Sequence, residues 1–123
     1  MSEREKPERE WRSFITDMVA SGEAVLSFTD SLDINQFQND ELRYKATLWD
    51  LRIIGEAASK IPEEVKDKYP MIPWGEVVGM RNRITHAYEA IDTDIVWDTI
   101  KTDIPKMLTD LREMLNQIDD NTT

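Results

Sequence analysis

Apolar residues recur every three or four positions along most of the chain, which is the period of a helix with one buried face. The first such stripe lies within about residues 7–28, and its members are Trp11, Phe14, Ile15, Met18, Val25 and Phe28. Hardly any segment alternates between apolar and polar residues as a half-buried strand would, and glycine and proline are sparse. The pattern therefore predicts an all-α protein.

A second helix is expected from a cap at Asn39 or Asp40 to about Ile61, before Pro62. It carries two apolar stripes, of which the first is Leu42, Ala46, Trp49, Ile53 and Ala57, and the second is Tyr44, Leu48, Leu51, Gly55 and Ala58. Two stripes predict a helix that is covered on two sides, by the domain core and by a second subunit. The small residues Gly55, Ala57 and Ala58 would allow another helix to approach closely.

Shorter segments flank this helix. Residues 29–39 are mostly polar and predict a connection with a short turn around residues 34–37. Residues 62–69 predict a short charged helix with Pro62 at its first position, where a missing N–H is tolerated.

Two long helices complete the expected fold. One begins at Pro73 and runs towards Tyr88, and the other runs from about Asp94 to about residue 118. Pro105 lacks a backbone donor and should kink the last helix near Lys101 or Thr102. Together the segments predict an antiparallel up-and-down bundle of four to five helices.

Length and composition fit one domain over residues 1–123, with frayed ends at about 1–6 and 119–123. A chain of 123 residues can bury a core without disulfides, and this one has no cysteine. Its charged start predicts no secretory signal, and it has no apolar run long enough to span a bilayer. A cytoplasmic protein is expected.

The net charge of −10 is unfavourable for binding nucleic acid, which depends on Lys and Arg. Two explanations stay open: a local basic patch could form within the acidic background, or the acidic surface could bind a basic protein. The candidates for the patch are Arg43, Lys45, Arg52, Arg81 and Arg83.

The most informative segment holds the only histidine of the chain and reads Arg81-Asn82-Arg83-Ile84-Thr85-His86-Ala87-Tyr88. Arg81 can bind a phosphate through two N–H groups, and His86 can transfer protons near neutral pH. Metal-free cleavage of an RNA phosphodiester needs these groups. The alternative is structural, because a lone histidine at a helix end often caps carbonyls.

This segment resembles the R-x4-6-H signature of the HEPN superfamily, and specifically that of HepT-like toxins, R-x4-H-x-Y. The likeness extends over about residues 42–108 and includes Ile54-Gly55-Glu56-Ala57-Ala58, Tyr69-Pro70-Met71-Ile72-Pro73-Trp74, Gly79-Met80-Arg81-Asn82, and Asp94-Ile95-Val96-Trp97 to Ile104-Pro105. It implies a HEPN-like bundle that acts as an endoribonuclease, with its active cleft at the interface of a homodimer or higher homo-oligomer.

Arg81 and His86 are the expected catalytic residues, with no metal ion or other cofactor. On an ideal helix they lie about 140° apart, whereas Tyr88 shares a face with Arg81. Either the helix ends near Thr85 and turns His86 towards Arg81, or two copies of the motif meet across a dimer.

Two residues are expected to support the site. Glu56 lies on or beside an apolar stripe, where a carboxylate is costly unless paired. It would pair with Arg81 or hold His86, and a position at the rim in water is the alternative. Asn82 could bind a phosphate oxygen or orient His86, or it could be a surface amide. The four tryptophans are expected to pack in the core rather than stack on bases.

The resemblance also implies a partner. HepT-like toxins are paired with an MNT-type nucleotidyltransferase antitoxin that transfers AMP from ATP onto the tyrosine of the motif, here Tyr88. By resemblance, the chain is expected to be an RNase toxin that acts on RNA, with tRNA favoured and DNA not expected. The rival interpretation is a non-catalytic HEPN bundle that docks a nucleotidyltransferase.

Overall fold

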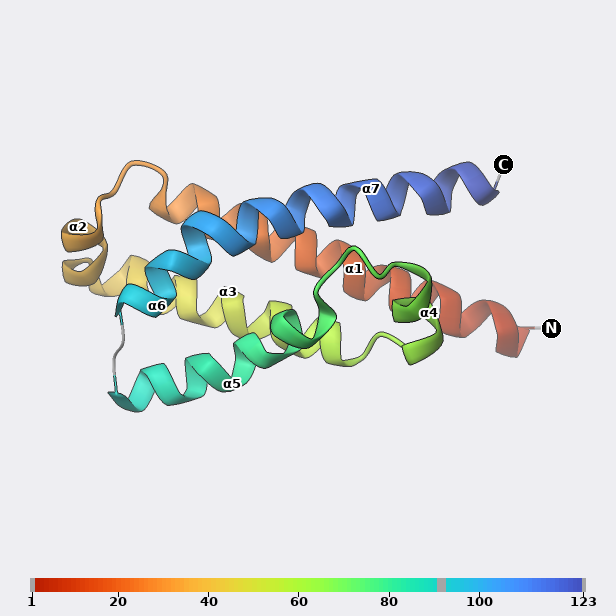
Figure 1. Ribbon diagram of the computed structural model, residues 1–123, viewed down its shortest axis with the longest axis horizontal. Helices are drawn as coiled ribbons and strands as arrows, with labels where there is room; N and C mark the ends of the chain where they lie inside the picture. The colour runs from red at the N-terminus through yellow and green to blue at the C-terminus, as the bar shows by residue number, and fades with distance from the viewer. Residues whose placement is uncertain (1, 91–92, 123) are drawn as a thin grey trace.

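The computed structural model describes the backbone of residues 2–90 and 93–122, and the side chains of residues 10–82, 84 and 93–120. The described backbone is helical and contains no strand (Figure 1). Its elements are α1 (Ser2–Thr29), α2 (Ile34–Asn39), α3 (Glu41–Ser59), α4 (Glu63–Lys68), α5 (Trp74–Ala90), α6 (Thr93–Asp98), the π-helix η1 (Thr99–Asp103) and α7 (Ile104–Thr122). None of these helices, over the residues described, is both long and apolar enough to cross a membrane.

The long helices α1, α3, α5 and α7 alternate in direction, so that both chain ends lie at the same end of the bundle (Figure 1). The predicted antiparallel all-α bundle is confirmed. Helix α3 packs against both α1 and α5, and α1 also packs against α7. Because α3 has neighbours on two sides, it is the element on which the motif helix α5 is positioned.

The two apolar stripes of α3 have different surroundings. In the second stripe, Leu48, Leu51, Gly55 and Ala58 are buried, and they form part of the core. In the first stripe, the side chain of Leu42 is 80% exposed and that of Trp49 is 58% exposed. The expectation that every tryptophan packs in the core is therefore wrong for Trp49, because its face of α3 has no neighbouring helix among the described residues.

Capping residues and prolines in the sequence predicted most helix ends to within a few residues of those observed. Asp40 caps α3 by accepting a hydrogen bond from the N–H of Arg43 at 3.0 Å, as expected. Helix α1 begins before residue 7, where the first apolar stripe was expected to start, because the Glu, Arg and Lys residues at the start of the chain favour helix. Pro62 is the N-cap of α4 rather than its first helical residue, since its ψ of 144° is extended.

The last helix is distorted at the position predicted from its proline. The N–H of Ile104 donates to the carbonyl of Thr99, five residues earlier, which is the hydrogen bond of a π-turn. Pro105 has no N–H to donate to the carbonyl of Lys101, so one hydrogen bond of a regular α-helix cannot form here. The helix widens into a π-turn at this position instead. The predicted kink is thus a π-helix between α6 and α7.

Candidate functional site

Helix α5 carries the whole motif without a break. Its start is fixed by Trp74, whose indole N–H donates to the carbonyl of Tyr69 at 3.1 Å. It continues to Ala90, so the expected alternative in which the helix ends near Thr85 is not found. Positions 81 and 86 are therefore about 140° apart around one helix. The side chains of Arg83, Thr85, His86 and Tyr88 lie outside the described residues.

Arg81 lies where α5 crosses α3, and Gly55 makes this crossing possible. A Cβ added to Gly55 would lie 2.8 Å from the Cβ of Arg81 and 2.9 Å from its backbone nitrogen. Real side chains do not approach so closely, so only glycine allows the backbone of α5 to pass at this distance. The expectation that Gly55 permits close helix approach is confirmed, and the residue it admits is Arg81.

The neighbours of Arg81 on α5 differ in burial, so that one face of the helix packs in the core and the adjoining polar side chains reach solvent. Met80 and Ile84 are buried in the core, with 3% and 8% of their surface exposed. Arg81 itself is partly buried, and Asn82 is exposed. A guanidinium at the boundary between core and solvent, next to an exposed amide, could bind a phosphate group without being fully desolvated.

Glu56 has a partner, Arg52, that differs from the two expected ones. Its Oε1 accepts a hydrogen bond from Nε of Arg52 at 3.1 Å, one helical turn earlier on α3. The guanidinium of Arg52 also lies over the ring of Trp49, 5.4 Å from its centroid. The Glu56 side chain is one-third exposed, so it lies at the rim of the crossing. Its pairing with Arg81 or His86 stays a prediction.

The basic side chains of α3 are largely neutralised by neighbours on the same helix. Arg43 pairs with Asp40 at 3.1 Å, and Lys45 pairs with Glu41 at 2.8 Å. Lys45 also lowers the pKa of Glu41 by hydrogen bonding to its carboxylate. Exposed pairs of this kind contribute only about 0–1 kcal/mol, so a phosphate could displace them. Acidic partners therefore weaken the positive potential of Arg43, Lys45 and Arg52, and the expected basic patch stays a prediction, because the side chain of Arg83 lies outside the described residues.

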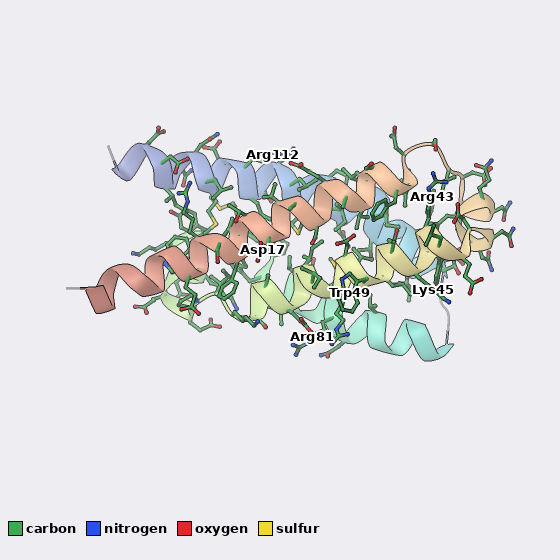
Figure 2. All side chains as sticks on the ribbon, turned by 180° about the vertical axis from the view of Figure 1, so that it is seen from behind. Asp17, Arg43, Lys45, Trp49, Arg81 and Arg112 are labelled. Atoms are coloured by element: carbon green, nitrogen blue, oxygen red, sulfur yellow. The ribbon has the colours of Figure 1, made fainter. Side chains whose placement is uncertain are left out.

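An exposed apolar surface adjoins these groups along α3. Its members are Leu42, Ala46, Trp49 and Ile53, which we call the α3 outer stripe; Leu42 and Trp49 are exposed, and Ala46 and Ile53 are partly so. Figure 2 shows Arg43, Lys45 and Trp49 following one another along α3, with Arg81 where α5 crosses this helix. A large exposed apolar row is typical of a surface covered by another chain.

Asp50 is a second partly buried carboxyl group of α3, and it lies on a different face from the site. Burial raises its pKa, and a hydrogen bond with Ser21 of α1 opposes that shift. Its position is about 140° around α3 from Gly55, towards α1 rather than α5. Asp50 is therefore a residue of the α1–α3 contact.

Among the residues described, no three His, Cys, Asp or Glu side chains gather as metal ligands would.

Sequence reasoning missed the Trp49–Arg52–Glu56 group. The signal was present, because Trp49 belongs to the first of two apolar stripes and Arg52 and Glu56 are four residues apart. The sequence pattern did not show which of the two apolar stripes of α3 would be left exposed to solvent.

Comparison with known proteins agrees with the motif. The family described as Ribonuclease HepT-like matches residues 18–118. A Methanocaldococcus jannaschii protein named "Putative RNase MJ0125" is 32% identical over 114 residues, covering 93% of this chain and 98% of that protein. A Thermococcus cleftensis protein named "Probable ribonuclease HepT" is 34% identical over 99 residues, covering 80% of this chain and 90% of that protein. No solved structure matches the chain significantly.

Proposed function

Because the chain belongs to the HepT-like ribonuclease family and is thus a ribonuclease of the HEPN type, we propose that it is the toxin of a toxin–antitoxin module. Its proposed substrate is tRNA in the cytoplasm, cleaved without a metal ion. One observation supports this most directly. The family match spans the whole motif, and α5 holds the Arg81 of that motif at a tight, partly exposed crossing with α3.

In the proposed reaction, His86 removes the proton of a ribose 2′-OH, or donates a proton to the leaving 5′-oxygen. The 2′-oxygen forms a bond to phosphorus, and the bond from phosphorus to the 5′-oxygen breaks. Arg81 stabilises the negative charge that develops on the phosphate oxygens. Asn82 would bind a phosphate oxygen or orient His86. The products carry a cyclic phosphate, or a 3′-phosphate after hydrolysis, and a 5′-hydroxyl.

The test is a cleavage assay on a cellular tRNA pool in the presence of EDTA, with intact mass recorded to show that the protein is unmodified. We expect cleavage with cyclic or 3′-phosphate ends. Loss of cleavage in EDTA, restored by added metal, would contradict the metal-free mechanism. Absence of cleavage by unmodified protein with or without metal would favour the binding-subunit alternative.

We propose further that two copies pair through the α3 outer stripe. Positions 81 and 86 diverge on one helix, so a pair of motifs across a twofold axis could supply an Arg81 and a His86 to the same phosphate. The exposed Leu42 and Trp49 support this, since they lie on α3, the helix whose Gly55 meets Arg81. Apolar and aromatic side chains of this kind form the centres of protein interfaces.

We expect Trp49→Glu to convert a dimer into a monomer of 14.4 kDa. Interface hot spots contribute about 2 kcal/mol or more, which corresponds to a rise of at least ~30-fold in the dimer dissociation constant. Sedimentation velocity over a concentration series measures this constant. The control is Ile95→Glu, which adds the same charge at a side chain on α6 that is 47% exposed. A dimer equally weakened by both variants would contradict the proposed interface.

The proposed antitoxin is a nucleotidyltransferase that transfers AMP from ATP onto the hydroxyl of Tyr88, releasing pyrophosphate. A bulky charged nucleotide beside Arg81 and His86 would exclude RNA from the cleft. We expect Tyr88→Phe to acquire no AMP and to resist silencing when incubated with the partner and ATP. Intact-mass and cleavage measurements report both effects. The matched controls are Tyr44→Phe and Tyr69→Phe, which should still be modified and silenced; covalent silencing of Tyr88→Phe would contradict the assignment.

The second candidate function is a non-catalytic subunit that docks a nucleotidyltransferase. Two observations favour it, the net charge of −10 and the neutralisation of the basic side chains of α3 by acidic neighbours. Both reduce attraction for RNA at long range. In this case the partner would bind, but the unmodified protein would not cut tRNA.

A further inference from the structure

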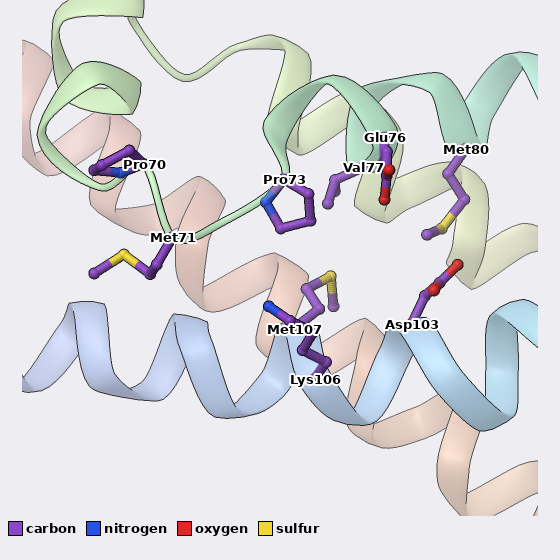
Figure 3. A pocket seen from close by; sticks show the side chains of 9 residues that line it. All are labelled: Pro70, Met71, Pro73, Glu76, Val77, Met80, Asp103, Lys106 and Met107. Carbon is purple, nitrogen blue, oxygen red and sulfur yellow. The ribbon is translucent and has the colours of Figure 1, made fainter.

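Helix α5 has two faces of different character. Val77 and Met80 on one face line a cavity of about 230 Å³, together with Met107 of α7 (Figure 3). These three side chains are each 3% exposed, so this face belongs to the core. Met80 is turned about 100° around the helix from Arg81, which meets Gly55 of α3. The side of α5 that could receive a phosphate is therefore the one bordered by α3.

Arg52 stands at this border. It lies three residues before Gly55 and three after Trp49, so it is about 60° around α3 from each of them. Gly55 faces α5, and Trp49 belongs to the exposed α3 outer stripe. Because α5 runs antiparallel to α3 (Figure 1), a residue one turn before Gly55 is level with residues 84–85, one turn after Arg81. Arg52 therefore lies beside the part of α5 that carries the rest of the motif.

The guanidinium of Arg52 is held by two neighbours on its own helix. Its Nε donates to Oε1 of Glu56 at 3.1 Å, and its central carbon lies over the ring of Trp49, 5.4 Å from the centroid. The side chain is nevertheless 52% exposed. Binding normally costs the entropy of ordering a long side chain, and a guanidinium that is already held loses less of it. Arg52 is therefore prepared to bind a ligand from solvent.

Glu56 occupies the inner nitrogen of Arg52 and leaves the outer ones. Of the N–H groups of a guanidinium, one is on Nε and the others are on Nη1 and Nη2. Within the stretches whose side chains the structure describes, Nη1 and Nη2 of Arg52 make no hydrogen bond. In Arg43 the acid binds Nη1, and in Lys45 it binds the only side-chain nitrogen. Of these three basic residues of α3, only Arg52 keeps the two-pronged end that suits a phosphate.

We propose that Arg52 binds, through Nη1 and Nη2, the RNA phosphate next to the one on which Arg81 and His86 act. This inference rests on the proposed ribonuclease function and adds a substrate-binding residue to its site. Glu56 weakens the attraction at long range, but a phosphate in contact with Nη1 and Nη2 accepts short, charge-assisted hydrogen bonds. Arg52 is one helical turn from the level of Arg81, so it holds substrate and transition state equally. Its loss should raise the RNA concentration that gives the half-maximal rate and leave the maximal rate unchanged.

Binding is measured without cleavage, in protein that carries His86→Ala. The probe is the cellular tRNA pool, labelled at its 5′ ends and titrated by filter binding over a series of salt concentrations. We expect added Arg52→Ala to weaken binding about tenfold and to lower the slope of log affinity against log salt by about 0.7–0.9, the values for one lost phosphate contact. Arg52→Lys keeps the charge but not the fork, so it should weaken binding several-fold and leave the slope unchanged.

The matched control is Arg112→Ala in the same background. Arg112 also pairs with one glutamate, Glu23 at 2.8 Å, and its side chain is 53% exposed. It lies on α7, away from the crossing of α3 and α5 (Figure 2). We expect this variant to bind tRNA within about twofold of its parent, because its charge is screened from the site by salt. Equal weakening by Arg112→Ala, or unchanged binding by Arg52→Ala, would overturn the proposal.

Single-turnover cleavage by Arg52→Ala with His86 intact gives the second readout. The half-saturating tRNA concentration should rise about tenfold, and the rate at saturation should stay within about twofold of the wild type. A lower rate at saturation with an unchanged half-saturating concentration would overturn the proposal, because Arg52 would then act on the reaction itself. Sedimentation velocity at the same protein concentration should show equal association of wild type and variant. A loss of dimer that accounts for the weaker binding would likewise overturn it.

Failure of the proposed reaction can be told apart from failure of this assignment. If unmodified wild type does not cut tRNA but Arg52→Ala weakens binding relative to Arg112→Ala, the role of Arg52 stands and the proposed cleavage of tRNA is wrong. If the wild type cuts tRNA and Arg52→Ala binds it as tightly as its parent does, the reaction stands and the role of Arg52 is wrong.

Discussion

Replacement of His86 by alanine is expected to lower the rate of RNA cleavage by about 10²–10⁴-fold, because one positioned acid or base contributes roughly this factor. Replacement of Arg81 by alanine should cost about 10²–10³-fold, through loss of charge stabilisation in the transition state. If both residues act on one phosphate, the double variant should be little worse than the poorer single variant. Single-turnover cleavage of tRNA in EDTA measures these effects.

The control for Arg81→Ala is Arg112→Ala. Arg112 lies on α7, across the bundle from Arg81, and pairs with Glu23 at 2.8 Å (Figure 2). Both variants remove one arginine and one positive charge, so a general loss of RNA attraction would affect them equally. We expect Arg112→Ala to cleave within about twofold of the wild type. Equal losses in both variants, or full activity of folded His86→Ala, would contradict the catalytic assignment.

Replacement of Gly55 by alanine is expected to destabilise the fold and to lower cleavage together. The added methyl group would meet the backbone of Arg81 at 2.9 Å, and backbone cannot rotate away as a flexible side chain can. Overpacking of this kind costs about 1–3 kcal/mol. For a domain of this size, this corresponds to a fall in Tm of roughly 4–12 °C. A displacement of Arg81 by about 1 Å could itself reduce the rate by about 10²-fold.

Gly79→Ala is the matched control, since Gly79 lies on α5 two residues before Arg81 and a Cβ there meets nothing within 4 Å. Alanine favours helix over glycine by about 0.5–1 kcal/mol, so this variant should melt higher than the wild type. Thermal unfolding followed by circular dichroism compares the two. If Gly55→Ala also melts higher, the close crossing of α3 and α5 is not a constraint on this protein.

Much of the fold could be predicted because its determinants are local. The cap at Asp40 and the distortion before Pro105 follow from hydrogen-bonding groups within one or two turns of the residue itself. Helical periodicity predicted the four long helices for the same reason, because a helix is stabilised by contacts between residues three and four apart. The motif at residues 81–88 identified the family without any geometry, and the match over residues 18–118 agrees with it.

The candidate site was predicted less completely. The residues of the motif could be named, and Gly55 could be recognised as a position of close approach. The pairing of Glu56 with Arg52 and the exposure of Trp49 were not foreseen. Each depends on which neighbours α3 has, and a side chain on a helix has several candidate partners at similar distance until those neighbours are fixed.

The sequence by itself determined where the helices lie, that the chain belongs to a ribonuclease family, and that α3 has two apolar faces. Only the tertiary structure decided which of those faces forms the core, that Arg81 is the residue admitted by Gly55, and that a cavity opens beside η1. The physical reason is that helix formation depends on residues close in the chain. Burial, crossing distance and cavity shape depend instead on helices joined by loops, whose packing is set by the whole core.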